Sequence, residues 1–179
     1  MQKIRAFIAV TLPETVVKSI HSVQVILQND LPGVRLVKSE LLHLTLHFFG
    51  QVDEDKAKIV IDRIKQRIET SKIAIEFKEL GGFPTKKRAR VVWIGIDSPG
   101  LTELANVVRD SVVSVGLPIE NRPFFPHLTI ARAKKSPVDM SQIHITPDIQ
   151  ECFSDTLVLF RSDLTPHGPI YTPLKVIQS

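Results

Sequence analysis

Apolar residues recur along this chain with two periods, and the pattern predicts strands alternating with helices. Helical spacing predicts three helices, which end near residues 28, 68 and 116 and begin near Pro13, Asp53 and Pro99. Alternating or short apolar runs predict strands over 3–11, 34–38, 41–49, 73–77, 91–96, 125–133, 156–163 and 170–177. Loops are predicted over 81–90 and 136–150, and a hairpin turn is predicted at Pro166, Gly168 and Pro169. This order of elements indicates an α+β or mixed α/β fold.

The length and composition of the chain suit one domain. Its 179 residues are 43% hydrophobic, which is enough to build a buried core. No segment between the predicted elements is long or polar enough to separate independent domains. We therefore expect residues 1–179 to form a single domain.

Composition also bears on compartment and partner. No apolar run approaches the roughly 20 residues of a membrane span, and the first ten residues lack a signal-peptide cleavage site, so we expect a cytoplasmic protein without a membrane partner. The net charge of +4 suits a partner that carries phosphate. Cys152 is the one cysteine, so no intramolecular disulfide or cysteine-based zinc site can form, and we expect it to be an unreactive, buried or half-buried residue.

One short pattern occurs twice, as His-Leu-Thr-Leu at 43–46 and His-Leu-Thr-Ile at 127–130. Both copies lie in predicted strands, where side chains alternate between two faces. His43 and Thr45 should therefore share one face, as should His127 and Thr129, while the intervening apolar residues face the core. Two copies in matching contexts are hard to explain by chance, and they predict a polar site with near two-fold symmetry.

Two such pairs provide the groups that displacement at phosphorus needs. An imidazole can give or take a proton at neutral pH, and a threonine hydroxyl can donate a hydrogen bond to a phosphate oxygen. The attacking and leaving oxygens lie roughly in line on opposite sides of the phosphorus, so one histidine can serve as base and the other as acid. The repeat thus predicts general acid–base catalysis by His43 and His127, with Thr45 and Thr129 binding the non-bridging oxygens.

A metal site is the rival use of the same histidines. Zinc needs three or four ligands, and neither motif strand carries an Asp, Glu or Cys. Of the other histidines, His47 shares the nominal face of His43 and could line the same cleft or sit at its rim, while His21 is expected on a helix surface. His144 and His167 fall in loop or turn contexts. We predict no metal ligands.

The sequence resembles the RNA 2′,3′-cyclic phosphodiesterases, also called 2′–5′ RNA ligases, of the 2H phosphoesterase superfamily. The resemblance runs over nearly the whole chain. It includes the double His-x-Thr-x motif and the stretches at 5–9, 41–50, 83–84, 92–93, 122–132, 160–162, 164–166 and 168–171. It implies an α+β fold of two pseudo-symmetric lobes, each an antiparallel sheet with outer helices, around a central cleft.

The resemblance also implies the reaction and the roles in it. RNA bearing a 2′,3′-cyclic phosphate would be hydrolysed to a 2′-phosphate, with His43 as proton donor and His127 as proton acceptor. From the residues alone the two histidines are nearly equivalent. Arg132 is implied to contact the phosphate and Phe48 to stack on a base, although each lies five residues after its histidine and so on the core face of an ideal strand.

Several alternatives remain open at this point. The same cleft could run the reverse reaction, as an ATP-independent 2′–5′ RNA ligase acting on tRNA halves, or the chain could be a non-catalytic RNA-binding module. No Gly-x-x-x-x-Gly-Lys-Ser/Thr loop is present, and we expect no cofactor. The basic run formed by Lys86, Lys87, Arg88 and Arg90 could track an RNA backbone or be a solvated loop. We expect a monomer.

Overall fold

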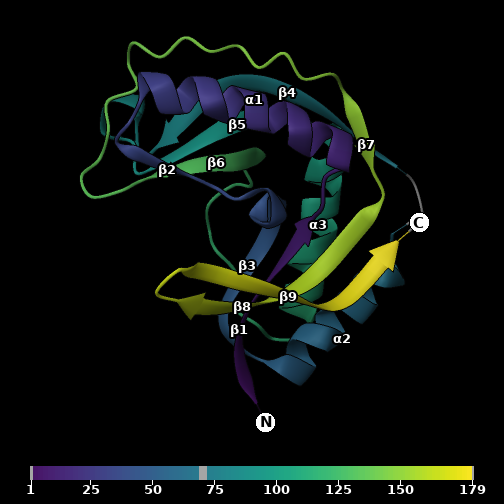
Figure 1. Cartoon of the computed structure of the whole chain (residues 1–179). Coiled ribbons are helices and arrows are strands. Elements are labelled where there is room, and N and C mark those ends of the chain that lie inside the picture. Colours follow the sequence, from purple (N-terminus) through teal and green to yellow (C-terminus); the bar gives the residue numbers. More distant parts are fainter. Residues whose placement is uncertain (1, 69–71, 179) are drawn as a thin grey trace.

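The computed structural model describes residues 2–68 and 72–178. It contains two antiparallel sheets and three α-helices, so the α+β prediction is confirmed (Figure 1). The chain crosses between the sheets several times, so each sheet is assembled from both halves of the sequence. Among the described residues, no helix is both long and apolar enough to cross a membrane.

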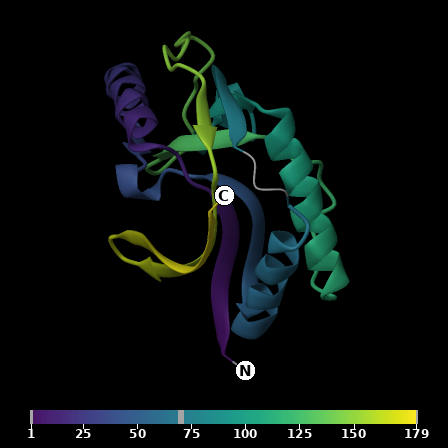
Figure 2. The same cartoon turned by 90° about the vertical axis from the view of Figure 1, so that its right-hand side faces the viewer.

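The first sheet has four strands in the order β3-β1-β8-β9, with β1 in the interior. The bounds are β1 Lys3–Val10, β3 Leu44–Asp53, β8 Thr156–Thr165 and β9 Gly168–Gln178. The predicted hairpin joins β8 to β9, and it curves away from the rest of the sheet (Figure 2).

The second sheet has five strands in the order β2-β6-β5-β4-β7. The bounds are β2 Val34–Leu36, β4 Ile73–Phe83, β5 Val91–Asp97, β6 His127–Ala133 and β7 Cys152–Ser154. Two single-turn 3₁₀ helices, Ser39–Leu41 and Lys86–Arg88, lie in the connections that follow β2 and β4.

The three helices cover the sheets from outside. They are α1 Glu14–Asp30, α2 Glu54–Lys65 and α3 Pro99–Ser114. The side chain of Asp53 accepts a hydrogen bond from the Asp55 amide, which caps the start of α2 as predicted. α1 packs on the five-stranded sheet, whereas α2 packs on the four-stranded sheet and on α3 (Figure 2).

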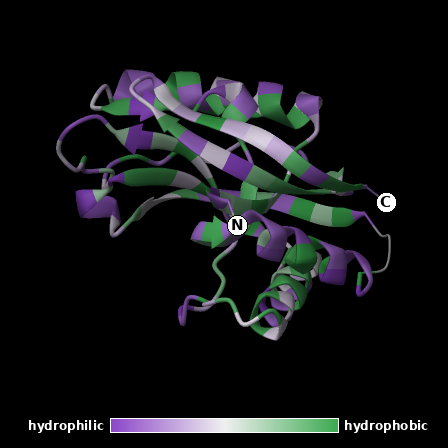
Figure 3. Cartoon of the chain, turned by 90° about the horizontal axis from the view of Figure 1, so that it is seen from below, coloured by the Kyte–Doolittle hydropathy of each residue, from purple (hydrophilic) through white to green (hydrophobic). Residues whose placement is uncertain are grey.

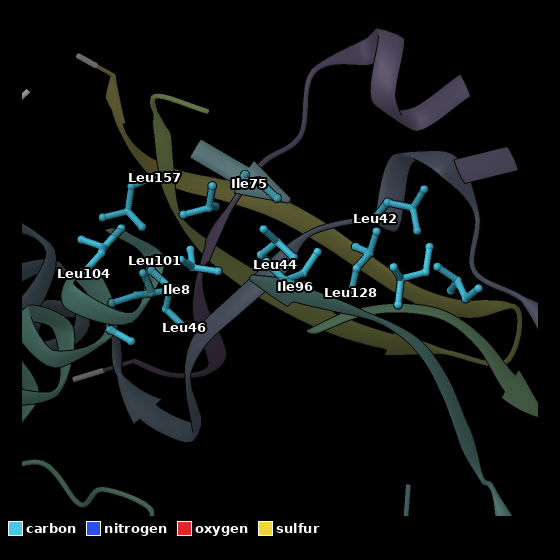
Figure 4. Packing of buried hydrophobic residues seen from close by; sticks show 14 of the residues in the cluster. Ile8, Leu42, Leu44, Leu46, Ile75, Ile96, Leu101, Leu104, Leu128 and Leu157 are labelled. Carbon is cyan, nitrogen blue, oxygen red and sulfur yellow. The ribbon is translucent and has the colours of Figure 1, made fainter. Parts of the chain in front are cut away.

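One continuous hydrophobic core links the two sheets and the helices. Leu44 of β3, Ile96 of β5 and Leu128 of β6 belong to it and lie where the two sheets approach each other (Figure 4). Hydrophobic and hydrophilic residues alternate along the ribbons, as a chain with one buried and one solvated face requires (Figure 3). The core therefore holds both motif strands in fixed positions.

Three sequence predictions need correction. Gly50 does not end its strand; it adopts a φ of 65° beside a bulge, and β3 continues to Asp53. The segment 81–83, predicted as loop, continues β4, because Gly81 and Gly82 pair with β5. The short strand β7 was missed, since three residues carry too little periodicity to be recognised.

Candidate active site

Both motif histidines line one cleft of about 710 Å³ between the sheets. His127 is the first residue of β6, and His43 lies directly before β3 rather than within it, because the 3₁₀ turn at Ser39–Leu41 delays the start of that strand. Residues of the segment 35–41 and of the β8–β9 hairpin turn at 167–171 also line the cleft.

The predicted alternation of the motif strands is confirmed. The apolar residues of both motifs are buried, at 1% exposure for Leu44 and 0% for Leu128. The side chains of His43, Thr45, His127 and Thr129 all line the cleft. Burial of one face in the core thus leaves the polar face of each motif in the same hollow.

The two imidazoles are held by the same backbone hydrogen bond. Nδ1 of His43 lies 2.7 Å from the carbonyl oxygen of Leu41, and Nδ1 of His127 lies 2.7 Å from that of Phe125. A carbonyl can only accept, so Nδ1 carries the proton in both rings and donates it. Nε2 is therefore the free nitrogen of each ring, able to accept a proton when the ring is neutral and to donate one when it is charged.

His43 sits against an aromatic wall. Its ring centroid is 4.8 Å from that of Phe7 and 5.4 Å from that of Tyr171, whose ring is edge-on. Burial is the main cause that lowers the pKa of His43 to about 4; the Leu41 hydrogen bond raises it, and the nearby charge of Arg132 lowers it further. In the free protein at neutral pH, His43 is therefore uncharged.

His127 packs against a second aromatic group. Its ring is perpendicular to Phe83 at 5.1 Å and also contacts Trp93 and Phe125. Trp93 can lie there because Gly81 is beneath it; a Cβ on that glycine would come within 2.1 Å of the indole. Burial lowers the pKa of His127, with a smaller lowering by Arg132.

A bulge in β6 brings Arg132 into the cleft. Val92 pairs with Ala131 and Trp93 pairs with Thr129, so one residue of β6 is left without a partner. Strict alternation would put Arg132 on the face opposite His127, but the extra residue reverses the faces beyond it. Arg132 therefore lines the cleft, as the family resemblance implied, although regular alternation along an ideal strand would have placed it on the core face.

A second bulge, in β3 between Thr45 and His47, has the same effect on Phe48. His47 pairs with the fully buried Ile8, while Phe48 pairs with Phe7, which lines the cleft. Phe48 therefore lines the cleft and is 41% exposed. The prediction that His47 shares the cleft face was wrong, because the bulge turns it away.

Several cleft residues were missed by the sequence analysis. Arg5, Arg35 and Lys38 line the cleft, and the guanidinium of Arg5 lies 4.4 Å from the centre of the Phe48 ring. Isolated cations in strands carry no local sequence signal, whereas dense runs do. The dense run at 86–90 does not line the cleft.

The remaining histidines and the cysteine take varied positions. His21 is exposed on α1 and His144 is exposed in a loop, while His167 lines the cleft from the hairpin turn. Cys152 is buried, and burial raises the pKa of its thiol. Within residues 2–68 and 72–178, no three His, Cys, Asp or Glu side chains are grouped closely enough to hold a metal ion.

Comparison with known proteins agrees with this geometry. The family model described as the 2′-5′ RNA ligase superfamily matches residues 12–153, which include both motifs. The chain belongs to this superfamily. The fold match covers more of the chain: the crystal structure of TT0787 from Thermus thermophilus matches this structure with a TM-score of 0.84 at 28% identity, covering 97% of each chain.

Relatives within the superfamily have named activities. An RNA 2′,3′-cyclic phosphodiesterase of Methanocaldococcus jannaschii is 34% identical over 176 residues, covering 96% of this chain and 98% of the relative. One from Escherichia coli is 33% identical, covering 79% of this chain and 77% of the relative. The structure of E. coli LigT complexed with 3′-AMP matches with a TM-score of 0.80 at 27% identity, covering 99% and 98% of the two chains.

Proposed function

We propose that this protein hydrolyses RNA 2′,3′-cyclic phosphate ends to 2′-phosphates, using two histidines and no metal ion. The observation that carries the proposal is the matched pair of Nδ1 hydrogen bonds, which presents two Nε2 atoms to one cleft. The relatives named RNA 2′,3′-cyclic phosphodiesterases support the choice of substrate. The expected setting is the cytoplasm, and tRNA fragments are candidate substrates.

In the proposed reaction, Nε2 of His127 accepts a proton from a water molecule while the water oxygen attacks phosphorus. The bond from phosphorus to the 3′ oxygen breaks, and Nε2 of His43 gives its proton to that oxygen, leaving a 2′-phosphate. The hydroxyls of Thr45 and Thr129 donate hydrogen bonds to the non-bridging oxygens, and Arg132 supplies a positive charge beside them. One proton leaves the water and one proton reaches the 3′ oxygen, so the net reaction adds one water molecule across the broken bond.

The low pKa of His43 sets a condition on this mechanism. An acid must carry a proton, yet His43 with a pKa of about 4 is neutral in the free protein at pH 7. A bound phosphate brings a negative charge close to the ring, which favours the charged imidazolium and raises its pKa. Substrate binding thus favours protonation of His43, which gives the general acid the proton that it must donate.

Phe48 provides a surface for the terminal base. Arg5 covers one face of the ring, so a base would stack on the other face. Stacking on an aromatic side chain contributes roughly 1–3 kcal/mol and tolerates any base. This suits an enzyme that recognises the chemistry of an RNA end rather than its sequence.

Ligation is a second candidate, favoured by the description of the matching family. If the 5′-hydroxyl of another RNA replaced water as the nucleophile, the same two histidines would join the strands through a 2′–5′ bond. The cyclic phosphate itself is the phosphoryl donor, and its bond to the 3′ oxygen breaks as the new bond forms, so no ATP is required. The identity of the product separates the two reactions.

The test is incubation of the protein and EDTA with a short RNA ending in a 2′,3′-cyclic phosphate, with chromatography against 2′-phosphate, 3′-phosphate and 2′–5′-linked standards. We expect a 2′-phosphate product that forms equally fast with and without EDTA. The variant His144→Ala, changed at an exposed histidine outside the cleft, should behave like the wild type. Activity that needs an added divalent ion, or a 3′-phosphate product, would contradict the proposal.

A further inference from the structure

Two arginines stand directly opposite each other on neighbouring strands beside the histidines. Arg35 of β2 pairs in register with Arg132 of β6, and both side chains line the cleft. Residues so paired have Cα atoms about 4.5–5.5 Å apart, well inside the screening length of about 10 Å at 0.1 M salt. Like charges in this position repel each other, so the pair destabilises the free protein.

No ion pair in the described chain relieves this repulsion. Arg67, Arg161 and Lys175 form ion pairs with carboxylates, but none of the ion pairs found within residues 2–68 and 72–178 involves Arg35 or Arg132. Arg5 and Lys38 of the same cleft also lack such a partner there, and Glu40 is the one acidic side chain among the described lining residues. The cleft is therefore built to receive more than one negative charge.

The two arginines differ in their position relative to the two histidines. The charge of Arg132 lowers the pKa of both His43 and His127, whereas Arg35 is not among the charges that act on either ring. Arg132 thus serves the phosphate held between the histidines, and Arg35 lies one strand further out. A phosphate bound at Arg35 would be a neighbour of the reacting one and not the same group.

We propose that Arg35 forms a second phosphate subsite, which binds the phosphodiester linking the terminal nucleotide to the one before it. The inference rests on the proposed function only in placing the terminal phosphate between His43 and His127. It makes the preferred ligand an RNA strand of at least two nucleotides, not a mononucleotide. With one phosphate beside Arg132 and the next beside Arg35, each of the two positive charges gains a negative partner, which offsets their repulsion.

Binding of three ligands tests the subsite without requiring turnover. They are a mononucleoside 2′-phosphate, a dinucleotide ending in the same nucleotide and 2′-phosphate, and that dinucleotide with an uncharged methylphosphonate link. We expect wild type to bind the charged dinucleotide about tenfold more tightly than either of the others. Arg35→Gln should abolish this preference and leave mononucleotide binding unchanged.

Two further readouts separate a binding role from a structural one. Arg35→Gln should flatten the logarithmic salt dependence of dinucleotide binding by about 0.7, the slope expected for one lost phosphate contact on a single strand. It should keep or raise the melting temperature of the free protein, because the repulsion from Arg132 is gone. Arg109→Gln, which removes an exposed arginine on α3 outside the cleft, is the matched control and should change neither binding nor salt slope.

Equal weakening of all three ligands by Arg35→Gln, or an undiminished preference for the charged dinucleotide, would overturn the inference. These outcomes are distinct from failure of the proposed function. A protein that hydrolyses cyclic phosphate ends but shows no dinucleotide preference loses only the second subsite. One that shows the preference without turnover keeps the subsite and loses the hydrolase.

Discussion

The two cleft histidines carry the same backbone hydrogen bond but sit in different surroundings. His43 is packed against Phe7 and Tyr171, while His127 contacts Phe83, the last residue of β4 in the other sheet. Burial lowers the pKa of both rings, and Arg132 adds to the effect on each. The near symmetry of the motifs therefore coexists with an asymmetry of environment that can distinguish acid from base.

These pKa values predict the pH dependence of kcat/KM. That parameter follows the ionisation of the free enzyme, and both histidines titrate below the usual value near 6.5, His43 at about 4. Catalysis requires His43 charged and His127 neutral; the product of these two populations is largest between the two pKa values and falls as pH rises. We expect a bell with its maximum between about pH 4 and 6.5, measured by initial rates across pH 4–9. A maximum above pH 7 would contradict the assignment.

Replacement of Arg132 should affect both binding and ionisation. Arg132→Gln removes the charge beside the phosphate, so we expect kcat/KM to fall roughly 10- to 100-fold. Because that charge lowers the pKa of both histidines, the same variant should raise both values in the free protein, as followed by NMR titration of the imidazole signals. Unchanged imidazole titrations would show that Arg132 lies farther from the rings than the structure places it.

At the scale of elements, bulges decide which side chains reach the cleft. Alternation in the sequence predicted the placement of His43, Thr45, His127 and Thr129, because each motif is short and regular. It failed for His47, since an extra residue in β3 reverses the faces that follow. A bulge depends on the pairing of two distant strands, and no local pattern in one strand reveals it.

The reversal in β3 predicts that replacement of Phe48 affects RNA binding whereas replacement of the adjacent His47 does not. Phe48→Ala should raise KM for RNA about tenfold or more with little change in kcat, because the base loses its stacking surface. His47→Ala should leave kcat and KM unchanged at temperatures where the variant stays folded, since its ring faces away from the cleft. Steady-state kinetics of the two variants provide the test. A larger increase in KM for His47→Ala than for Phe48→Ala would contradict the pairing of β3 with β1 described above.

At the scale of the whole molecule, one core joins both sheets. The helices and most strands could be predicted from periodicity, but the strand order could not, because antiparallel neighbours such as β1 and β8 are far apart in sequence. Nor could the sequence place Arg35 opposite Arg132, which depends on the pairing of β2 with β6. We also propose that the chain acts as a single domain of two similar lobes, and as a monomer.

A continuous core predicts cooperative unfolding. Trp93, the single tryptophan, reports on the five-stranded sheet, whereas far-ultraviolet circular dichroism reports on all elements. We expect the two signals to change in one coincident transition in urea. Leu128→Ala, at a fully buried position between the sheets, should lower the free energy of unfolding by about 2–5 kcal/mol. Two separate transitions would show that the sheets unfold independently.

The central claim is that His43 and His127 act together as a metal-free acid–base pair. Its most direct test is kcat for cyclic phosphate hydrolysis in EDTA by the wild type, His43→Ala, His127→Ala and the double variant. We expect each single variant to lose roughly 10²–10⁴-fold, and the double variant to lose far less than the product of the two losses, because residues that act as a unit are not additive. A single variant that keeps near wild-type kcat, or a wild type inactive in EDTA, would contradict the mechanism.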